Sequence, residues 1–379
     1  MPSPSPRPVL FLLHGIGKHS PDWALAEDGP IKAMEAAAGL YGCLRPDGLD
    51  KAVEIIPIRY DDIFDRLMAK WAEQAKELRP WSTALGSGLL DSGLDLLAKG
   101  DSGGLVPAVG CDVLLYRGFK LFAQRIQLHV AYEMAKAISE RTVGVRGAPP
   151  RFYVMAHSLG TAVAHDAMQR LAAESWRDVE EVGQGDPQGI RRQLDGLDQI
   201  RASGFKPGQF RFEALFQISN TSRLMHMTDE GQTDSAVRPG AGVQQYFNVD
   251  HKFDPVSKVL PFAIPQGWKD SRGGAEIEVR HFYQDNIHGF SHYLRHPQVH
   301  AALFRQLFRD DFRLSPQEID GIRAFPDIGR AFSQMQADRL QGVIRPLLEK
   351  AATAAAPTLQ TIRLWLDLFR DAKGLLGIP

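Results

Sequence analysis

Residues 152–167 read FYVMAHSLGTAVAHDA. An apolar run with strand character leads into a serine, and small residues that suit a helix follow it. This order predicts a strand, a sharp turn and a helix, with Ser158 at the turn. Such a turn lifts the serine hydroxyl above the edge of a sheet, and the first N–H groups of the helix stay available to a developing negative charge. Ser158 is therefore a candidate nucleophile.

Strand-like segments alternate with helical ones along most of the chain. We predict strands over residues 9–13, 53–58, 152–155, 212–218, 245–249 and 276–282. Short apolar strands separated by helices are typical of a largely parallel sheet covered on both faces. The sequence thus predicts an α/β fold, with a mostly parallel central sheet flanked by helices.

Three regions are expected to add to this plan. The connection after the second strand is too long for one crossover helix, which predicts a helical, lid-like insertion at about residues 61–111. Residues 311–379 are expected to form a C-terminal helical extension, which leaves residues 1–310 as the main domain. Residues 177–211 are polar and rich in Gly, Gln and Arg, which predicts a mobile excursion between the turn's helix and the next strand.

Composition narrows the class of protein. The chain has 379 residues, with 44 Lys and Arg against 45 Asp and Glu, and this balance gives no reason to expect a nucleic acid partner. The two cysteines, Cys43 and Cys111, form no disulfide framework and fit a reducing compartment. The first residues show no signal-peptide pattern, and no apolar run reaches membrane-spanning length. We therefore expect a soluble, cytoplasmic protein.

A serine hydroxyl needs a base and a carboxylate before it can attack a carbonyl. On a sheet of this type the acid and then the histidine follow the serine along the chain. Asp254 comes just after a predicted strand, in a turn fixed by Pro255, and is the favoured acid; Asp250, nearer the strand, is the alternative. His288 follows the last predicted strand and is the favoured base, with His292 as the alternative.

The first predicted strand ends in a short glycine-containing loop, His14-Gly15-Ile16-Gly17. Glycines let the backbone turn its N–H groups toward a reacting carbonyl. The predicted oxyanion donors are the backbone N–H groups of Ile16 and of Leu159. The side chains of His14 and His157 are expected to support this loop and the turn around Ser158.

Three motifs occur in order: residues 14–17, residues 156–160, and the pair Asp254 and His288. Over about residues 8–310 the chain resembles the α/β-hydrolase superfamily, and within it the lipase- and esterase-like serine hydrolases. The departure is Ala156, where the pattern usually has glycine. The resemblance implies the α/β-hydrolase fold, a Ser158–Asp254–His288 catalytic triad, an oxyanion hole and no cofactor. It implies cleavage of carboxylic esters, lipid esters and thioesters included, through an acyl-enzyme.

Four histidines, at positions 288, 292, 296 and 300, recur every fourth residue. On one helix they would form an imidazole stripe suited to a metal, but Gly289 and Pro297 interrupt any single helix. No H-E-x-x-H motif accompanies them. We therefore expect no metal site here.

The partners that we expect follow from this resemblance and from the C-terminal region. The substrate would be a small acyl ester or a lipid. The apolar face of residues 359–376 is expected to pack on the main domain or on a second copy in a homo-oligomer. Its charge is not strongly basic, so contact with a membrane surface is allowed but not indicated. Two alternatives to a hydrolase stay open: an inactive hydrolase-fold scaffold for protein interactions, and an acyltransferase using the same triad.

Overall fold

The computed structural model describes residues 6–15, 19–44, 48–63, 120–174, 176, 187–225, 242–252, 254, 257, 262–271, 273–280 and 288–323. Within them, six strands form one open sheet in the order β2-β1-β3-β4-β5-β6, and all neighbours are parallel. The strands are β1 (Val9–Leu13), β2 (Glu54–Ile58), β3 (Phe152–His157), β4 (Phe212–Ile218), β5 (Val243–His251) and β6 (Gly274–Val279). The predicted α/β class and parallel sheet are confirmed.

The strand order reverses direction once. From β1 the chain passes to β2 on one side, and it then continues on the other side of β1 with β3 to β6. In open parallel sheets, ligands bind beyond the carboxyl ends of the strands at such a reversal. The segment predicted to carry the nucleophile follows β3, directly at this point.

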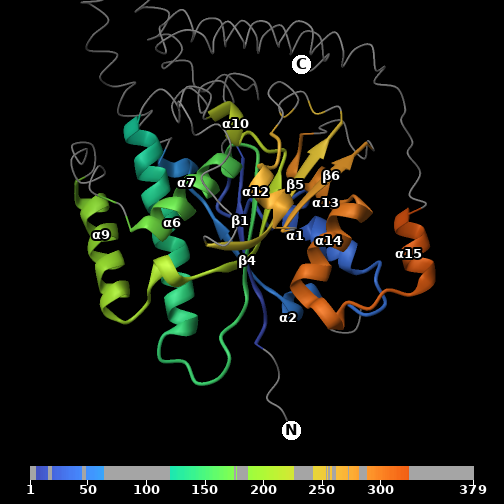
Figure 1. The fold of residues 1–379 in the computed structure, drawn as a ribbon, viewed down its shortest axis with the longest axis horizontal. Coiled ribbons are helices and arrows are strands. Elements are labelled where there is room, and N and C mark those ends of the chain that lie inside the picture. Colours follow the sequence, from blue (N-terminus) through green and yellow to red (C-terminus); the bar gives the residue numbers. More distant parts are fainter. Residues whose placement is uncertain are drawn as a thin grey trace, which may run out of the picture.

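Helices cover both faces of the sheet (Figure 1). One face carries α6 (Lys120–Thr142), α7 (Leu159–Ala173) and α9 (Pro187–Ala202). The other carries α1 (Pro30–Ala38), α13 (Phe290–Leu294) and α14 (Pro297–Phe308). The remaining short elements are α2 (Leu49–Ala52), η1 (Pro207–Gln209), α10 (Ser222–Met225), α12 (Gln266–Asp270), η2 (Arg309–Asp311) and α15 (Pro316–Arg323).

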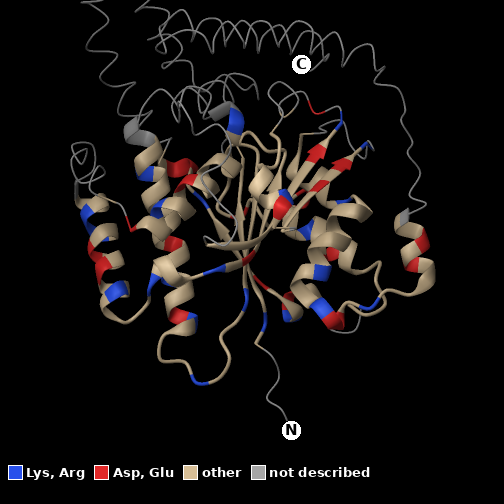
Figure 2. Cartoon of the chain, in the orientation of Figure 1, with Lys and Arg blue, Asp and Glu red and all other residues tan. Residues whose placement is uncertain are grey.

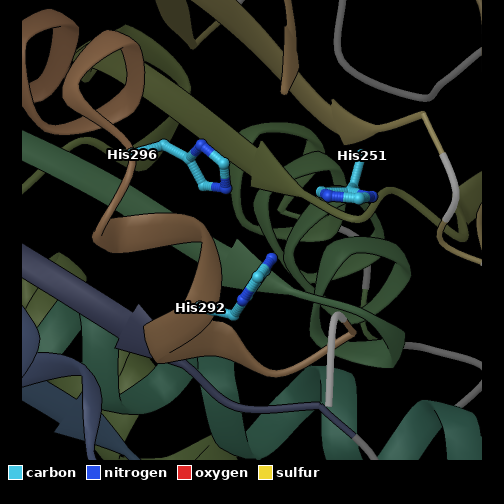
Figure 3. A group of neighbouring side chains, drawn as sticks. All are labelled: His251, His292 and His296. Atoms are coloured by element: carbon cyan, nitrogen blue, oxygen red, sulfur yellow. The ribbon is translucent and has the colours of Figure 1, made fainter. Parts of the chain in front are cut away.

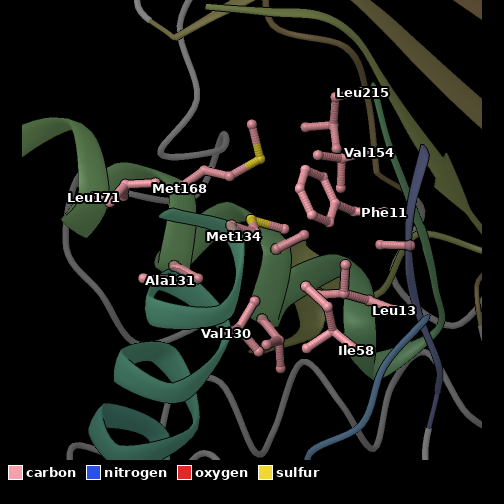
Figure 4. Packing of buried hydrophobic residues seen from close by; sticks show 14 of the residues in the cluster. Phe11, Leu13, Ile58, Val130, Ala131, Met134, Val154, Met168, Leu171 and Leu215 are labelled. Carbon is pink, nitrogen blue, oxygen red and sulfur yellow. The ribbon is translucent and has the colours of Figure 1, made fainter. Parts of the chain in front are cut away.

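Alternation along the strands divides the core into two layers. In β1, Phe11 and Leu13 face the α6 and α7 side, whereas Leu10 and Leu12 face α1 and α14. All four side chains are fully buried, because successive residues of a strand point to opposite faces. Figure 4 shows the first layer, where Phe11 and its neighbours lie against the two helices.

The prediction for residues 177–211 was wrong over its described part. Residues 187–202 form α9, which packs on α6 (Figure 1). Ile190 and Leu197 recur at helical spacing and are buried against the core. Gly196 faces Tyr132 of α6 so closely that a Cβ at this position would lie 2.5 Å from the ring. The polar residues of this segment form the solvent-exposed face of α9, and its few apolar residues pack against the core.

Most of the predicted insertion and extension lies outside the described residues. Only residues 61–63 of the insertion and 311–323 of the extension are described, so both regions stay predictions. Charges of both signs are interspersed over the helices (Figure 2). Among the helices that the structure describes, none combines the length and the apolar character needed to cross a bilayer.

Candidate active site

Ser158 lies at the tight turn between β3 and α7, as the sequence predicts. Its backbone has φ 51° and ψ −125°, a region that residues other than glycine rarely occupy. A conformation of this kind costs on the order of 1–3 kcal/mol and persists only where the surroundings impose it. The side chain makes no cap hydrogen bond to its own helix, so the hydroxyl is left to other partners.

The peptide groups of Ser158 are held on both sides. Its N–H donates to the carbonyl of Ile218 at the end of β4, at 3.0 Å. Its carbonyl accepts hydrogen bonds from the hydroxyls of Thr161 (2.6 Å) and Thr221 (2.9 Å) and from the Thr161 N–H (2.9 Å). These four bonds offset the strain of the turn, and they tie the turn to the segment that follows β4.

Two glycines allow the turn to lie against the end of β1. A Cβ on Gly160 would lie 2.3 Å from the carbonyl oxygen of His14, so only glycine lets α7 start here. A Cβ on Gly15 would lie 2.8 Å from the Cβ of Ser158. Gly15, the second residue after β1, therefore lies directly against the serine, which is where an oxyanion loop would have to begin.

The three residues favoured from the sequence form one hydrogen-bonded chain. The Ser158 Oγ lies 2.9 Å from Nε2 of His288. The Nδ1 of the same ring lies 2.8 Å from Oδ2 and 3.1 Å from Oδ1 of Asp254. The carboxylate is fully buried, and Ser158 is 2% exposed. The candidate nucleophile, base and acid are thus within hydrogen-bonding distance in the order that general-base activation would require.

Asp254 is held as an anion in the protein interior. Burial alone would raise the pKa of its carboxyl group, but the neighbouring His288 and hydrogen bonds from His288, Ser219 and Tyr293 outweigh burial and lower the pKa well below its usual value. The hydroxyls of Ser219 and Tyr293 each donate to Oδ2 at 2.6 Å. An ionised carboxylate in this position fixes the tautomer of the His288 ring, with the proton on Nδ1 and the lone pair of Nε2 toward Ser158.

His157 supports the backbone of the base. Its Nε2–H donates to the carbonyl of His288 at 2.6 Å, and its ring stacks on Phe290. Burial is the largest cause that lowers the pKa of His157, to about 3, so the ring is neutral at pH 7. The side chain predicted to support the turn thus contacts the backbone of the candidate base.

His14 supports the loop after β1 in a similar way. Its Nδ1 lies 2.7 Å from the carbonyl of Gly15, and its Nε2 accepts the N–H of Tyr60 at 3.3 Å. Burial holds the pKa of His14 well below its usual value. Asp61 is 3.7 Å from Nε2 and accepts the His19 N–H at 2.6 Å, which ties the start of the predicted insertion to this loop.

The alternative acid and base lie apart from Ser158, and one of the two predicted oxyanion donors lies outside the described residues. Asp250 accepts a hydrogen bond from the Ser257 hydroxyl, whereas His288 is hydrogen-bonded to Asp254. His292 is buried in α13 beside His251 and His296.

Leu159 opens α7, where its N–H precedes the first intrahelical hydrogen bond. The other predicted donor, Ile16, and its neighbour Gly17 lie outside the described residues.

The sequence interpretation missed two donors to the acid, Ser219 and Tyr293. Ser219 directly follows β4, the strand beside β3, and has φ 50°. A hydroxyl at the carboxyl end of a strand next to the nucleophile was a usable signal. Nothing in the sequence marked Tyr293, because its contact depends on how α13 packs under the loop of Asp254.

Comparisons with known proteins add no relative: no protein-family model, no curated protein and no solved structure matches the chain. Its function is therefore inferred from the residues of the site.

Proposed function

We propose that the chain is a serine hydrolase of the α/β-hydrolase superfamily that cleaves carboxylic esters, lipid esters and thioesters included, through an acyl-enzyme. One observation carries the proposal. Ser158 Oγ, the His288 ring and the buried Asp254 carboxylate form a continuous hydrogen-bonded chain, with contacts of 2.9 Å and 2.8 Å. The strained backbone at the serine and the parallel sheet with helices on both faces support it further.

In the first half of the proposed reaction, the Ser158 oxygen attacks the ester carbonyl while His288 Nε2 takes its proton. Asp254 stabilises the imidazolium that forms. The tetrahedral intermediate then collapses, the bond to the leaving oxygen or sulfur breaks, and the proton on Nε2 passes to the leaving group. The acyl group stays on Ser158 as an ester.

Two backbone N–H groups are assigned to the oxyanion of this intermediate. The N–H of Leu159 lies at the first position of α7, where the helix dipole also favours negative charge. The N–H of Ile16 is assigned from the sequence motif, and the contact of Gly15 with Ser158 supports the assignment. Each donor of this kind contributes about 3 kcal/mol to transition-state stabilisation.

In the second half, water replaces the leaving group. His288 takes a proton from water, the hydroxide oxygen attacks the acyl carbon, and the proton returns to Ser158 as the carboxylic acid leaves. The same residues perform both halves, so no cofactor enters the balance.

Turnover of p-nitrophenyl esters by Ser158→Ala tests the proposal. We expect the variant to lose at least about 1,000-fold in kcat, because it lacks the nucleophile. Ser203→Ala is the matched control, since this serine lies beyond α9 and bonds to Ile200 and Ser139 away from the triad. Turnover by folded Ser158→Ala at the wild-type rate would exclude the mechanism.

A further inference from the structure

Three buried histidines from two separate parts of the chain lie close together. His251 ends β5, His292 lies in α13, and His296 precedes the first turn of α14. Their side chains are 0%, 0% and 3% exposed. One ring nitrogen from each lies within 4.8 Å of the other two. Figure 3 shows the three rings around a common space.

The ring geometry is close to what one metal ion requires. The ring centres are 5.4 Å apart for His251 and His292, 5.3 Å for His292 and His296, and 6.1 Å for His251 and His296. Tetrahedral bonds of about 2.1 Å from zinc to nitrogen place the bonded nitrogens about 3.4 Å apart and the ring centres about 5.2 Å apart. The two separations that involve His292 are close to this value, and the His251–His296 separation of 6.1 Å has to shorten when an ion binds.

We propose that His251, His292 and His296 bind one divalent transition-metal ion of the zinc type. Imidazole nitrogen suits zinc, cobalt, nickel and copper, whereas magnesium and calcium prefer oxygen ligands. Three protein ligands leave the fourth tetrahedral position to water or another small ligand.

The proposed site differs from the histidines at every fourth residue, for which we expected no metal site. His288 is hydrogen-bonded to Ser158 instead. Nδ1 of His300 lies 2.7 Å from the Tyr41 hydroxyl, to which it is hydrogen-bonded. Pro297 opens a new helix, so the regular spacing makes no single stripe. His251, distant along the chain, supplies the third ligand in the proposed site.

The proposed ion links the two segments that carry the acid and the base. The His251 carbonyl accepts the N–H of Asp254 at 3.1 Å. His292 is followed by Tyr293, whose hydroxyl donates to the Asp254 carboxylate. The ion therefore holds the end of β5 against α13, and it positions Asp254 without contacting a reacting atom. This consequence rests on the proposed function; the binding of the ion does not.

Zinc retention by the full chain, purified without a histidine tag, tests the proposal. The protein is loaded with ZnCl2, desalted and analysed for metal. We expect stoichiometric zinc in the wild type, and at least about a tenfold loss of affinity when His292→Asn and His296→Asn are combined. His300→Asn is the matched control, because it also removes a buried α14 imidazole but should retain zinc.

A cobalt spectrum keeps the test independent of how the variants fold. CoCl2 added to the metal-free wild type should give the visible bands of tetrahedral cobalt. Zinc should also raise the Tm of the wild type and of His300→Asn but not that of the double variant. Folded wild type that retains no zinc and gives no cobalt bands would overturn the proposal. Labelling of Ser158 by a fluorophosphonate, measured on the same metal-free protein, reports separately on the proposed hydrolase.

Discussion

Asp254 places a charge in the interior of the site. A fully buried carboxylate is costly unless its charge is compensated. Here one oxygen accepts three hydrogen bonds, from His288, Ser219 and Tyr293. Hydrogen bonds from the two hydroxyls stabilise the charged carboxylate more than the neutral acid, so they favour the ionised form of Asp254.

Removing one of these hydroxyls should weaken catalysis. Tyr293→Phe leaves the ring in place but removes a hydrogen bond to a charged group, which is worth about 1.5–3 kcal/mol. We expect kcat for a p-nitrophenyl ester to fall by at least about tenfold, with little change in KM. Ser219→Ala should act in the same direction.

The control for this prediction is Tyr153→Phe, which also removes a tyrosine hydroxyl. That hydroxyl donates to the backbone carbonyl of Gln306 and not to the Asp254 carboxylate. Its kcat should stay at the wild-type value. Wild-type kcat in folded Tyr293→Phe would show that the hydroxyl does not position the acid.

His157 should make stability depend on pH. Burial lowers its pKa in the folded protein to about 3, whereas the unfolded chain titrates near 6.5. Between these values the unfolded state binds more protons, so stability is lost as pH falls below about 6.5. In His157→Gln, which keeps an N–H donor, this contribution disappears.

Urea unfolding at two pH values measures the effect. Between pH 6 and pH 5, the wild type should lose about 1 kcal/mol more in free energy of unfolding than His157→Gln does. Other buried histidines, such as His14 and His300, cancel in this difference. An equal loss in both proteins would mean that His157 is not the neutral, buried group described.

The turn between β3 and α7 depends on close backbone packing. At Gly160 an added methyl group would meet the carbonyl oxygen of His14, a backbone atom that cannot rotate away. Ala156, two residues before Ser158, has no such contact and is simply buried in the core. This difference explains why the turn tolerates alanine at its first small position and needs glycine at the second.

Gly160→Ala should therefore destabilise the protein. We expect a loss of about 1–3 kcal/mol in free energy of unfolding, typical of overpacking. Gly321→Ala is the matched control: this glycine lies in α15, and a Cβ there meets nothing within 4 Å. Alanine favours a helix, so the control should be unchanged or up to about 1 kcal/mol more stable. Urea midpoints that rank the two variants in the opposite order would contradict the packing described.

Elements with strong local signals were predictable, and those that depend on tertiary contacts were not. A continuous apolar run located β1, and a mostly apolar one located β4, at their observed bounds. The few apolar residues of α9 are spaced among many polar ones, so the sequence alone did not indicate a helix. They form its buried face only because α9 packs on α6. Likewise, the triad candidates follow from their positions after strands, whereas the contact of Tyr293 needs the packing of α13.

At the scale of the whole molecule, the strand order assembles the site. β1, β3, β4 and β5 are consecutive neighbours, and their carboxyl ends bring the Gly15 loop, Ser158, Ser219 and the Asp254 loop side by side. His288, after β6, reaches back across this edge to Ser158. Residues distant along the chain meet because parallel strands all end at one edge.

If Ser158 is the activated nucleophile that we propose, a fluorophosphonate should modify it covalently. A fluorophosphonate is incubated with the full chain, and the labelled peptide is identified by mass spectrometry. We expect stoichiometric labelling on Ser158, retained in Ser203→Ala and strongly slowed in His288→Gln. Folded wild-type protein that stays unlabelled, or that is labelled at another serine, would contradict it.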